Sequence, residues 1–138
     1  MFRTTLMAAA LAAVAAPAFA QDVTGLWQTQ TNGGQVEISR CGNSICGKLT
    51  TSDHIKTNPA LKDVRNKDTS QRDRPLKGLQ MLWGFQGGPD KWTGGKVYNP
   101  DDGGTYSGTI TMKSPTTLKL KGCIVVPLCK SETWTRIK

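Results

Sequence analysis

Gly25-Leu26-Trp27 near the start of the chain and Trp134-Thr135-Arg136 at its end are the two stretches that decide the fold. A Gly-x-Trp in a first strand and an Arg late in the last strand are typical of closed up-and-down β-barrels. In such barrels the Trp27 indole plugs one end, and the Arg136 guanidinium lies across its face in a cation–π contact of roughly 0.5–2 kcal/mol. We therefore predict that Trp27 and Arg136 close a barrel, whose interior is either filled or holds one small ligand.

Between these ends, alternating apolar and polar residues predict eight short strands. The predicted strands cover residues 23–30, 35–41, 44–51, 79–86, 91–98, 106–112, 118–121 and 130–137. Turn residues cluster between most of them, as in the Asn-Pro-Asp-Asp-Gly-Gly run at 99–104. In the fourth strand Leu79, Met81, Trp83 and Phe85 are predicted to share one face. The fold class predicted for residues 21–138 is all-β, a single eight-stranded antiparallel up-and-down barrel.

One connection, residues 52–78, is longer than ordinary loops. Asn58-Pro59 resembles an N-cap followed by Pro at the first helical position, which predicts a short helix to about Arg65, with Asn66 able to end it. Seven bases and three acids fall within residues 56–77, a local net charge of +4. The bases are Lys56, Lys62, Arg65, Lys67, Arg72, Arg74 and Lys77. This charged loop is either a lid over the barrel mouth or a solvated spacer.

Residues 1–20 have the organisation of a secretory signal peptide. Arg3 is followed by an apolar stretch from Leu6 to Ala16 and by Ala18-Phe19-Ala20, which resembles a cleavage site. The apolar stretch is too short to cross a bilayer, which takes about 20 helical residues. The residue after the cut is Gln21, so no lipid-modified cysteine is expected there. We predict a periplasmic or secreted mature chain, residues 21–138, with no membrane span.

The four cysteines form two close pairs, Cys41 with Cys46 and Cys123 with Cys129. An even number of cysteines in an exported chain favours disulfides. Three connectivities exist, and the two local bridges are favoured because each pair straddles a predicted hairpin turn. Four cysteines also make zinc sites, but neither spacing is Cys-x-x-Cys, and His54 is the only histidine. We expect two structural disulfides and no metal.

The order of these motifs resembles that of an exported bacterial family known as domain-of-unknown-function family 2147. The motifs are Gly25-Leu26-Trp27, Val36-Glu37-Ile38, Cys41-Gly42 through Ile45-Cys46-Gly47, Asp63 and Asn66, Arg74 to Leu79, Trp92 to Pro100, Gly104-Thr105-Tyr106, Leu118 to Gly122, and Thr133 to Arg136. The resemblance covers essentially all of residues 21–138. It implies an exported lipocalin-like (calycin-like) barrel and implies no activity.

Sequence signals for catalysis are weak. The one imidazole that could serve a Ser–His–acid arrangement is His54, which lies beside Asp53 in the charged loop. Asp101 and Asp102 are adjacent in a turn and point apart, whereas the carboxylates of glycosidases face each other across about 5–10 Å. Together with Asn99 they also lack the distal Glu of a calcium loop. We predict that the protein is not an enzyme and has neither catalytic residues nor a cofactor.

The chain is basic, with a formal net charge of +8, which raises the question of nucleic acid. Single-strand binding needs aromatic side chains among the bases, and residues 56–77 contain no aromatic residue. We therefore expect no nucleic-acid partner. The basic loop 56–77 is instead a candidate site for an envelope protein, an acidic partner or anionic lipid headgroups, or it is simply solvated.

Aromatic residues on several predicted strands converge inside a closed barrel. Trp83, Trp92 and Tyr106 are predicted to supply the wall of a ligand site, with Arg72 and Arg74 near its mouth. The leading hypothesis is an exported, disulfide-stabilised, non-enzymatic binding protein for a small, lipophilic or partly apolar envelope molecule that can be anionic. The alternative is a solid-cored structural or protein-interaction module of the cell envelope, because eight strands leave little interior space.

Overall fold

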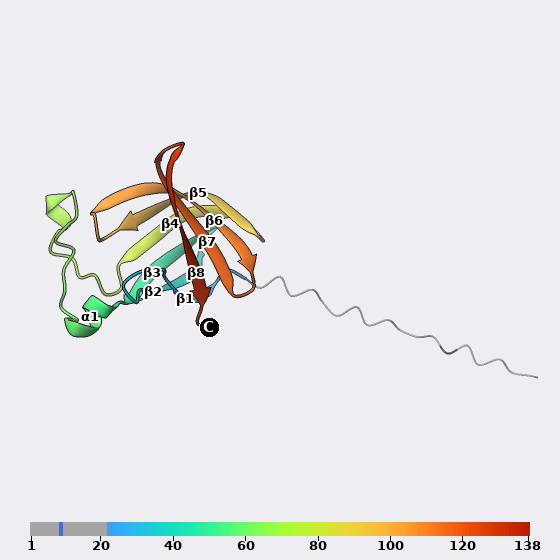
Figure 1. Cartoon of the computed structure of the whole chain (residues 1–138), viewed down its shortest axis with the longest axis horizontal. Helices are drawn as coiled ribbons and strands as arrows, with labels where there is room; N and C mark the ends of the chain where they lie inside the picture. Colours follow the sequence, from blue (N-terminus) through green and yellow to red (C-terminus); the bar gives the residue numbers. More distant parts are fainter. Residues whose placement is uncertain (1–8, 10–21) are drawn as a thin grey trace, which may run out of the picture.

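The computed structural model describes residues 9 and 22–138, so the predicted signal peptide falls almost entirely outside the described residues. Within residues 22–138, eight antiparallel strands pair in chain order and close into a barrel (Figure 1). The strands are β1 (Gly25–Gln28), β2 (Gln35–Cys41), β3 (Ser44–Thr51), β4 (Gln80–Gly87), β5 (Lys91–Asn99), β6 (Gly104–Ser114), β7 (Thr117–Val125) and β8 (Leu128–Arg136). The predicted up-and-down barrel is confirmed, and the strand limits differ from the predicted ones mainly at their ends.

The two ends of the barrel differ in construction. At the closed end, Trp27 of β1 is fully buried and pairs in register with Arg136 of β8. The Arg136 guanidinium carbon lies 4.4 Å from the centre of the Trp27 ring, and the guanidinium donates 2.9 Å hydrogen bonds to the carbonyls of Thr24 and Pro115. The opposite end, the mouth, carries the long loop and the β7–β8 turn.

Side chains fill the closed half of the barrel. Trp27, Ile38, Phe85, Trp92 and Leu118 belong to one buried cluster. The Phe85 ring packs directly on the backbone of Gly95, where an added Cβ would lie 2.3 Å from the ring. Only a residue without a side chain fits beneath that ring, so β5 carries a glycine at an inward position.

The predicted face of the fourth strand is partly wrong. Leu82 and Phe85 are buried, whereas Trp83 is half-buried and pairs with exposed Lys96 on the outer surface. The register explains the change, because β4 carries two extra residues relative to β3: two steps from Gln80 to Leu82 match one step along β3, and three steps from Leu82 to Phe85 match two. The first irregularity brings Leu82 inward and turns Trp83 outward; the second, a β-bulge at Gly84 with φ +75°, returns Phe85 to the inside.

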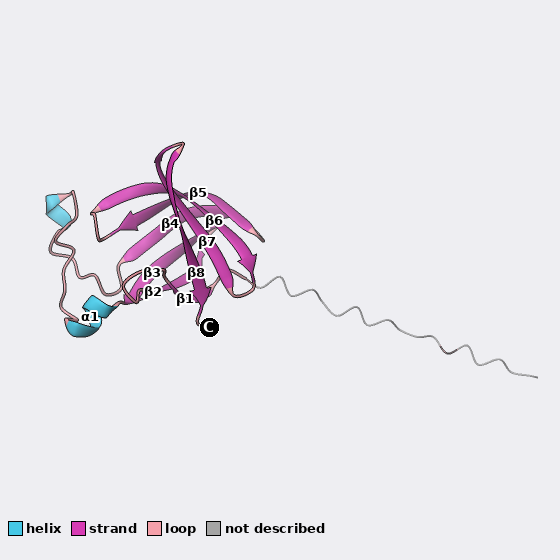
Figure 2. Ribbon diagram, in the orientation of Figure 1, coloured by secondary structure: helices cyan, strands magenta, loops and turns pink. Residues whose placement is uncertain are grey.

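The predicted helix beginning at Asn58-Pro59 is also misplaced. The helix in the long loop is α1 (Asp53–Thr57), and it ends at Asn58; a short 3₁₀ turn, Thr69–Gln71, follows later in the loop (Figure 2). Ser52 caps α1 by accepting a hydrogen bond from the Ile55 amide, and Ile55 is buried. Asn58 is extended, as expected for a residue before proline, so the helix cannot continue through it.

The two local disulfides are confirmed. Cys41–Cys46 joins β2 to β3, and Cys123–Cys129 joins β7 to β8. Because the strands alternate in direction, the first bridge lies at the closed end and the second at the mouth. Each therefore fixes the hairpin turn that it encloses.

Candidate functional site

The open half of the barrel contains a cavity of about 780 Å³. Ligand sites in proteins commonly have volumes of roughly 300–1,000 Å³, so this one is large enough for a small organic molecule. The barrel interior is thus divided: the closed half is a packed core, and the half below the mouth is hollow. The barrel is therefore neither completely filled by side chains nor completely hollow.

The walls of the cavity are mainly apolar. They include Leu49, Leu76, Met81, Val97, Leu120 and Trp134. Gly122 of β7 also lines the cavity, and a Cβ added there would meet only the Cβ of Tyr106, at 3.6 Å. The missing side chain at this inward position therefore contributes to the hollow.

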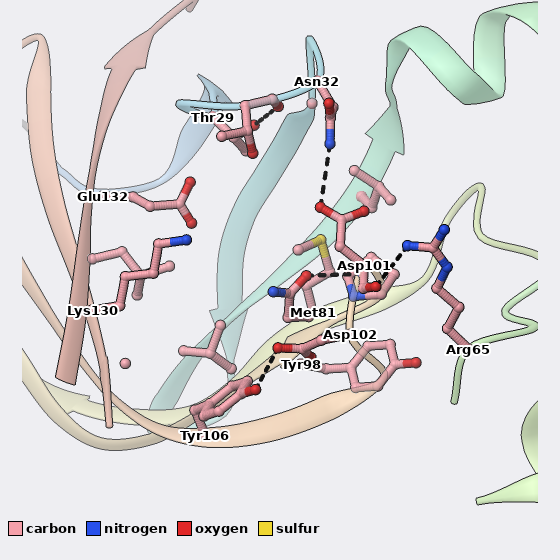
Figure 3. Close-up of a pocket in the computed structure, with 18 of the residues that line it drawn as sticks. Thr29, Asn32, Arg65, Met81, Tyr98, Asp101, Asp102, Tyr106, Lys130 and Glu132 are labelled. Atoms are coloured by element: carbon pink, nitrogen blue, oxygen red, sulfur yellow. Dashed lines mark hydrogen bonds between the residues drawn. The ribbon is translucent and has the colours of Figure 1, made fainter. Parts of the chain in front are cut away.

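Two buried polar atoms of β8 face this interior. Glu132 Oε1 and Trp134 Nε1 have no hydrogen-bond partner among the described residues, and both residues line the cavity. Burial raises the pKa of Glu132. The Lys130 ammonium and the Trp134 indole oppose that rise, although the indole completes no hydrogen bond with the carboxylate. In Figure 3, Glu132 and Lys130 project from the same strand. Together they give an apolar site a small polar region.

Tyr106 lines the cavity from β6, which β7 separates from β8. Its hydroxyl donates to Asp102, and this bond, with burial, raises the pKa of Tyr106 (Figure 3). Asp102 also accepts a hydrogen bond from the Gly104 amide, and Asn99 accepts one from the Asp101 amide. The oxygens of this turn thus stabilise the turn, the role that Asn and Asp usually have there, and also bind Tyr106 of β6 and Asn32 of the β1–β2 loop.

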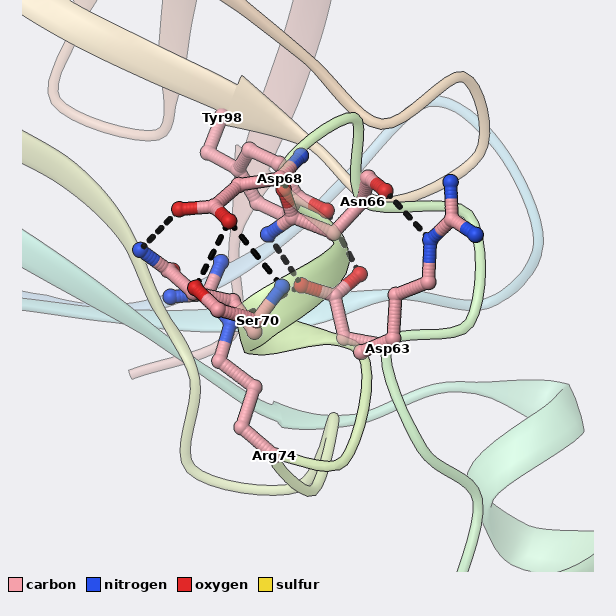
Figure 4. Close-up of polar contacts among 8 residues, drawn as sticks. Asp63, Asn66, Asp68, Ser70, Arg74 and Tyr98 are labelled. Carbon is pink, nitrogen blue, oxygen red and sulfur yellow. Dashed lines mark hydrogen bonds and ion pairs between the residues drawn. The ribbon is translucent and has the colours of Figure 1, made fainter.

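The long loop is fixed over the mouth by a buried carboxylate. Asp63 is 1% exposed and accepts hydrogen bonds from Tyr98 at 2.5 Å, Arg74 at 2.8 Å and Asn66 at 2.9 Å (Figure 4). The Arg74 guanidinium also lies 4.9 Å from the centre of the Tyr98 ring. Since Tyr98 belongs to β5, this cluster ties the loop to the barrel. Leu61 and other loop residues reach the cavity as a result.

The structure brings only one of the five predicted ligand residues to the cavity, and that residue is Tyr106. Trp92 is 5% exposed and belongs to the packed core, while Trp83 faces outward because of the register shift between Gln80 and Leu82. Arg74 is held by Asp63, and Arg72 donates to the Asn66 carbonyl at 2.8 Å. Trp83 and Trp92 therefore do not line this cavity, whereas Arg72 and Arg74 lie in the loop over the mouth, where Asn66 and Asp63 hold them.

Sequence reasoning missed Glu132, Lys130 and Gly122. A signal for Lys130 and Glu132 was available in the sequence. Both lie an even number of residues from Trp134 in the last strand, so their side chains face the same side of the sheet as the Trp134 ring. An acid on the face of a buried tryptophan is an unusual choice for a packed core. Gly122 gave no signal, because a glycine in a strand does not reveal whether its missing side chain leaves space.

Residues 22–138 were compared with two further kinds of site, a metal-ligand cluster and a membrane-spanning helix. In this described range no group of three or more His, Cys, Asp or Glu side chains is arranged to hold a metal ion. Among the same residues, no helix has the length and apolar character needed to cross a membrane.

An eight-stranded antiparallel barrel with a closed end, a hollow mouth half and a long loop across the opening defines the lipocalin-like class. A family model described as "Uncharacterized protein conserved in bacteria (DUF2147)" matches residues 25–136, and the chain belongs to this family. The family description names no activity.

Comparison with solved structures agrees with this class. A protein from the human pathogen Helicobacter pylori, described as belonging to the lipocalin family, is 25% identical with a TM-score of 0.76, over 85% of this chain and 84% of that chain. A redesigned β-barrel is 20% identical with a TM-score of 0.45, over 86% of this chain and 94% of the other. No protein with a curated description matches.

Proposed function

We propose that this protein is a non-enzymatic carrier that binds one small, partly apolar molecule in the open half of its barrel. The observation that carries the proposal is the cavity of about 780 Å³, whose walls are apolar and whose interior holds two unpartnered polar atoms. A solid-cored interaction module would fill this volume, because protein interiors are normally close-packed. The cavity therefore favours the carrier over that alternative.

The two polar atoms define the chemistry of the ligand. Trp134 Nε1 can only donate a hydrogen bond, and the ionised Glu132 carboxylate can only accept. A hydroxyl or primary amide supplies both complements at once. Leaving such groups unsatisfied in a buried site costs about 1–3 kcal/mol each, so their pairing would favour binding. The proposed ligand is an apolar molecule that enters with a hydroxyl or amide group foremost.

A negative charge on the ligand is compatible with the site but is not required by it. Lys62, Arg65 and Lys130 line the cavity, as do Asp101 and Asp102. Arg65 already donates to the Asp101 carbonyl at 2.9 Å. Since these charges largely offset one another, an anionic group would remain at the mouth beside the lysines, where solvent completes its solvation.

Export to the periplasm or the cell exterior is part of the same proposal. Two disulfides stabilise the barrel, and such bridges persist in oxidising compartments. The signal-peptide pattern in residues 1–20 points the same way. The ligand would accordingly be a molecule of the cell envelope or its surroundings.

Native mass spectrometry of the exported chain tests the proposal. Gly122→Phe places a ring in the cavity where a Cβ is tolerated, and Ser107→Phe adds the same ring at an exposed position of β6. We expect wild type and Ser107→Phe to carry an extra mass that denaturation releases, and Gly122→Phe to lack it. The denatured chain should start after residue 20 and be lighter than its reduced form by four hydrogens.

Two results would count against the carrier. One is the same adduct on Gly122→Phe as on the wild type, which would place the bound molecule elsewhere. The other is a wild-type chain that carries no adduct and also takes up no apolar molecule in solution.

A further inference from the structure

The β7–β8 hairpin ends in an exposed apolar tip. Its residues Ile124, Val125, Val126 and Leu128 are 70%, 61%, 81% and 63% exposed. Pro127 lies among them and is also exposed. Two other large apolar side chains of the described chain are exposed: Ile137 follows β8 at the closed end, and Val64 belongs to the long loop and lines the same cavity as Ile124 and Leu128. Exposed apolar residues gathered in this way usually mark a contact surface.

The tip is rigidly presented. Cys123 and Cys129 are direct partners across the two strands and are joined by a disulfide immediately beneath it. Figure 1 shows this hairpin extending beyond the barrel at the end opposite the chain terminus. Val126 is three positions along the chain from each cysteine, a reach of about 10 Å at roughly 3.3 Å per position.

The charged side chains on the hairpin closest to the tip are lysines. From residue 103 to residue 131 the sequence contains no Asp or Glu. On the hairpin, Lys121 pairs with Ser131 and Lys130 pairs with Gly122, so both lysines lie just below the disulfide. Lys62 and Arg65 of the long loop line the same mouth, where Asp101 and Asp102 offset them, so the net positive charge near the tip comes from Lys121 and Lys130.

We propose that this hairpin tip docks the barrel, mouth first, on a membrane surface rich in anionic phospholipid. Apolar side chains of interfacial segments enter the headgroup and acyl boundary by about 5–10 Å, which matches the reach of the tip. At that depth Lys121 and Lys130 lie at the level of the phosphates, and each cation near such a surface strengthens binding. Docking through the tip does not require a ligand in the cavity.

A protein partner fits the tip less well. Stable protein interfaces take about 20–30 residues from each side, and the tip supplies five on a convex turn. A lipid surface needs no matching shape, only a wedge of apolar side chains with cations behind it. The tip and its lysines provide these two elements.

Vesicle flotation tests the proposal with matched variants. The purified chain is mixed with vesicles of phosphatidylcholine, with and without phosphatidylglycerol. Val125→Ser/Val126→Ser removes apolar surface from the tip, and Ile137→Ser does so at the closed end. Lys121→Gln/Lys130→Gln removes charge beside the tip, and Lys91→Gln/Lys113→Gln removes it at the closed end.

We expect the wild type to float only with phosphatidylglycerol vesicles, and less so at high salt. The tip serine variant should lose roughly tenfold or more in partitioning, and the Lys121/Lys130 variant roughly tenfold. Both closed-end variants should bind like the wild type. Unchanged thermal unfolding would show that the tip variants are folded, because the substituted side chains are exposed.

Several outcomes would overturn the proposal. These are no binding to anionic vesicles, an equal loss with the closed-end variants, or a tip-dependent dimer in sedimentation without vesicle binding. A separate comparison isolates the carrier function: Gly122→Phe should still float, and Val125→Ser/Val126→Ser should still bind an apolar molecule in its cavity. Failure of one function would therefore leave the other measurable.

Discussion

The Tyr98 hydroxyl on β5 donates a 2.5 Å hydrogen bond to Asp63, which lies 35 residues earlier in the chain. Asp63 also receives hydrogen bonds from Arg74 and Asn66 of its own loop. A single buried carboxylate thus holds a long, basic, largely exposed loop against the barrel. The position of that loop determines how the mouth of the cavity is built.

Asp63→Ala should therefore destabilise the protein and loosen the loop. It leaves the Tyr98 hydroxyl and the Asn66 amide without their partner, whereas Arg74 is partly exposed and can turn to water. We expect a loss of about 2–4 kcal/mol in chemical denaturation, with faster hydrogen exchange in residues 61–76. Asp73→Ala is the control, since its 3.8 Å contact with Lys62 is at the surface and should contribute under about 1 kcal/mol. Equal effects of the two substitutions would contradict this account.

Tyr98 should ionise only in strongly alkaline solution. Burial, followed by the hydrogen bond and negative charge of Asp63, raises the pKa of Tyr98 to about 12 from its ordinary 10.0. The folded state then retains a proton that the unfolded state loses, so stability falls as the pH rises from 10.0 to about 12. Tyrosinate absorbance of wild type and Tyr98→Phe would measure this. A Tyr98 transition near pH 10 in the folded protein would contradict the buried contact.

Glu132 makes a second prediction about pH. Because burial raises its pKa, the folded protein binds a proton more tightly than the unfolded chain does. Stability therefore falls as the pH rises above the ordinary Glu value of 4.5. Glu132→Gln should melt at a higher temperature than wild type at neutral pH, with the difference shrinking toward acid pH. Exposed Glu37→Gln should show no such pattern; the same pattern in both variants would refute a local effect.

Trp27 should contribute more to stability than Trp83, which the sequence pattern predicts to face inward but which lies on the outer surface. Trp27→Ala removes a fully buried ring that plugs the closed end, at an expected cost of about 3–5 kcal/mol. Trp83→Ala removes a half-buried ring from the outer surface and should cost clearly less. Denaturant titrations of both variants would decide. A loss below about 1 kcal/mol for Trp27→Ala would mean that it is not the barrel plug.

The strands and their order were predictable because period-two alternation and turn residues are local signals. Gly25-Leu26-Trp27 and Arg136 identified the two strands that meet to close the barrel, and the structure places the guanidinium over the indole. The cysteine pairs were readable for a similar reason, since each encloses its own turn. Local patterns thus specified the scaffold.

The candidate site was less predictable, because its residues depend on register and on distant pairing. A register shift between Gln80 and Leu82 turns Trp83 outward, a bulge at Gly84 returns Phe85 to the inside, and no alternation rule anticipates these extra residues. Arg74 could have met a ligand, but Asp63, eleven residues earlier, already binds it. The division of the interior into a packed half and a hollow half arises from the sum of many side-chain volumes.

Titration with the neutral fluorescent probe N-phenyl-1-naphthylamine tests the central claim, a ligand-sized apolar cavity in the open half of the barrel, most directly. We predict saturable enhancement of fluorescence with one site per chain in wild type and Ser107→Phe. In Gly122→Phe the added ring occupies the cavity, so affinity should fall roughly tenfold or more. Absence of saturable binding to the wild type, or equal affinity in Gly122→Phe, would contradict the claim.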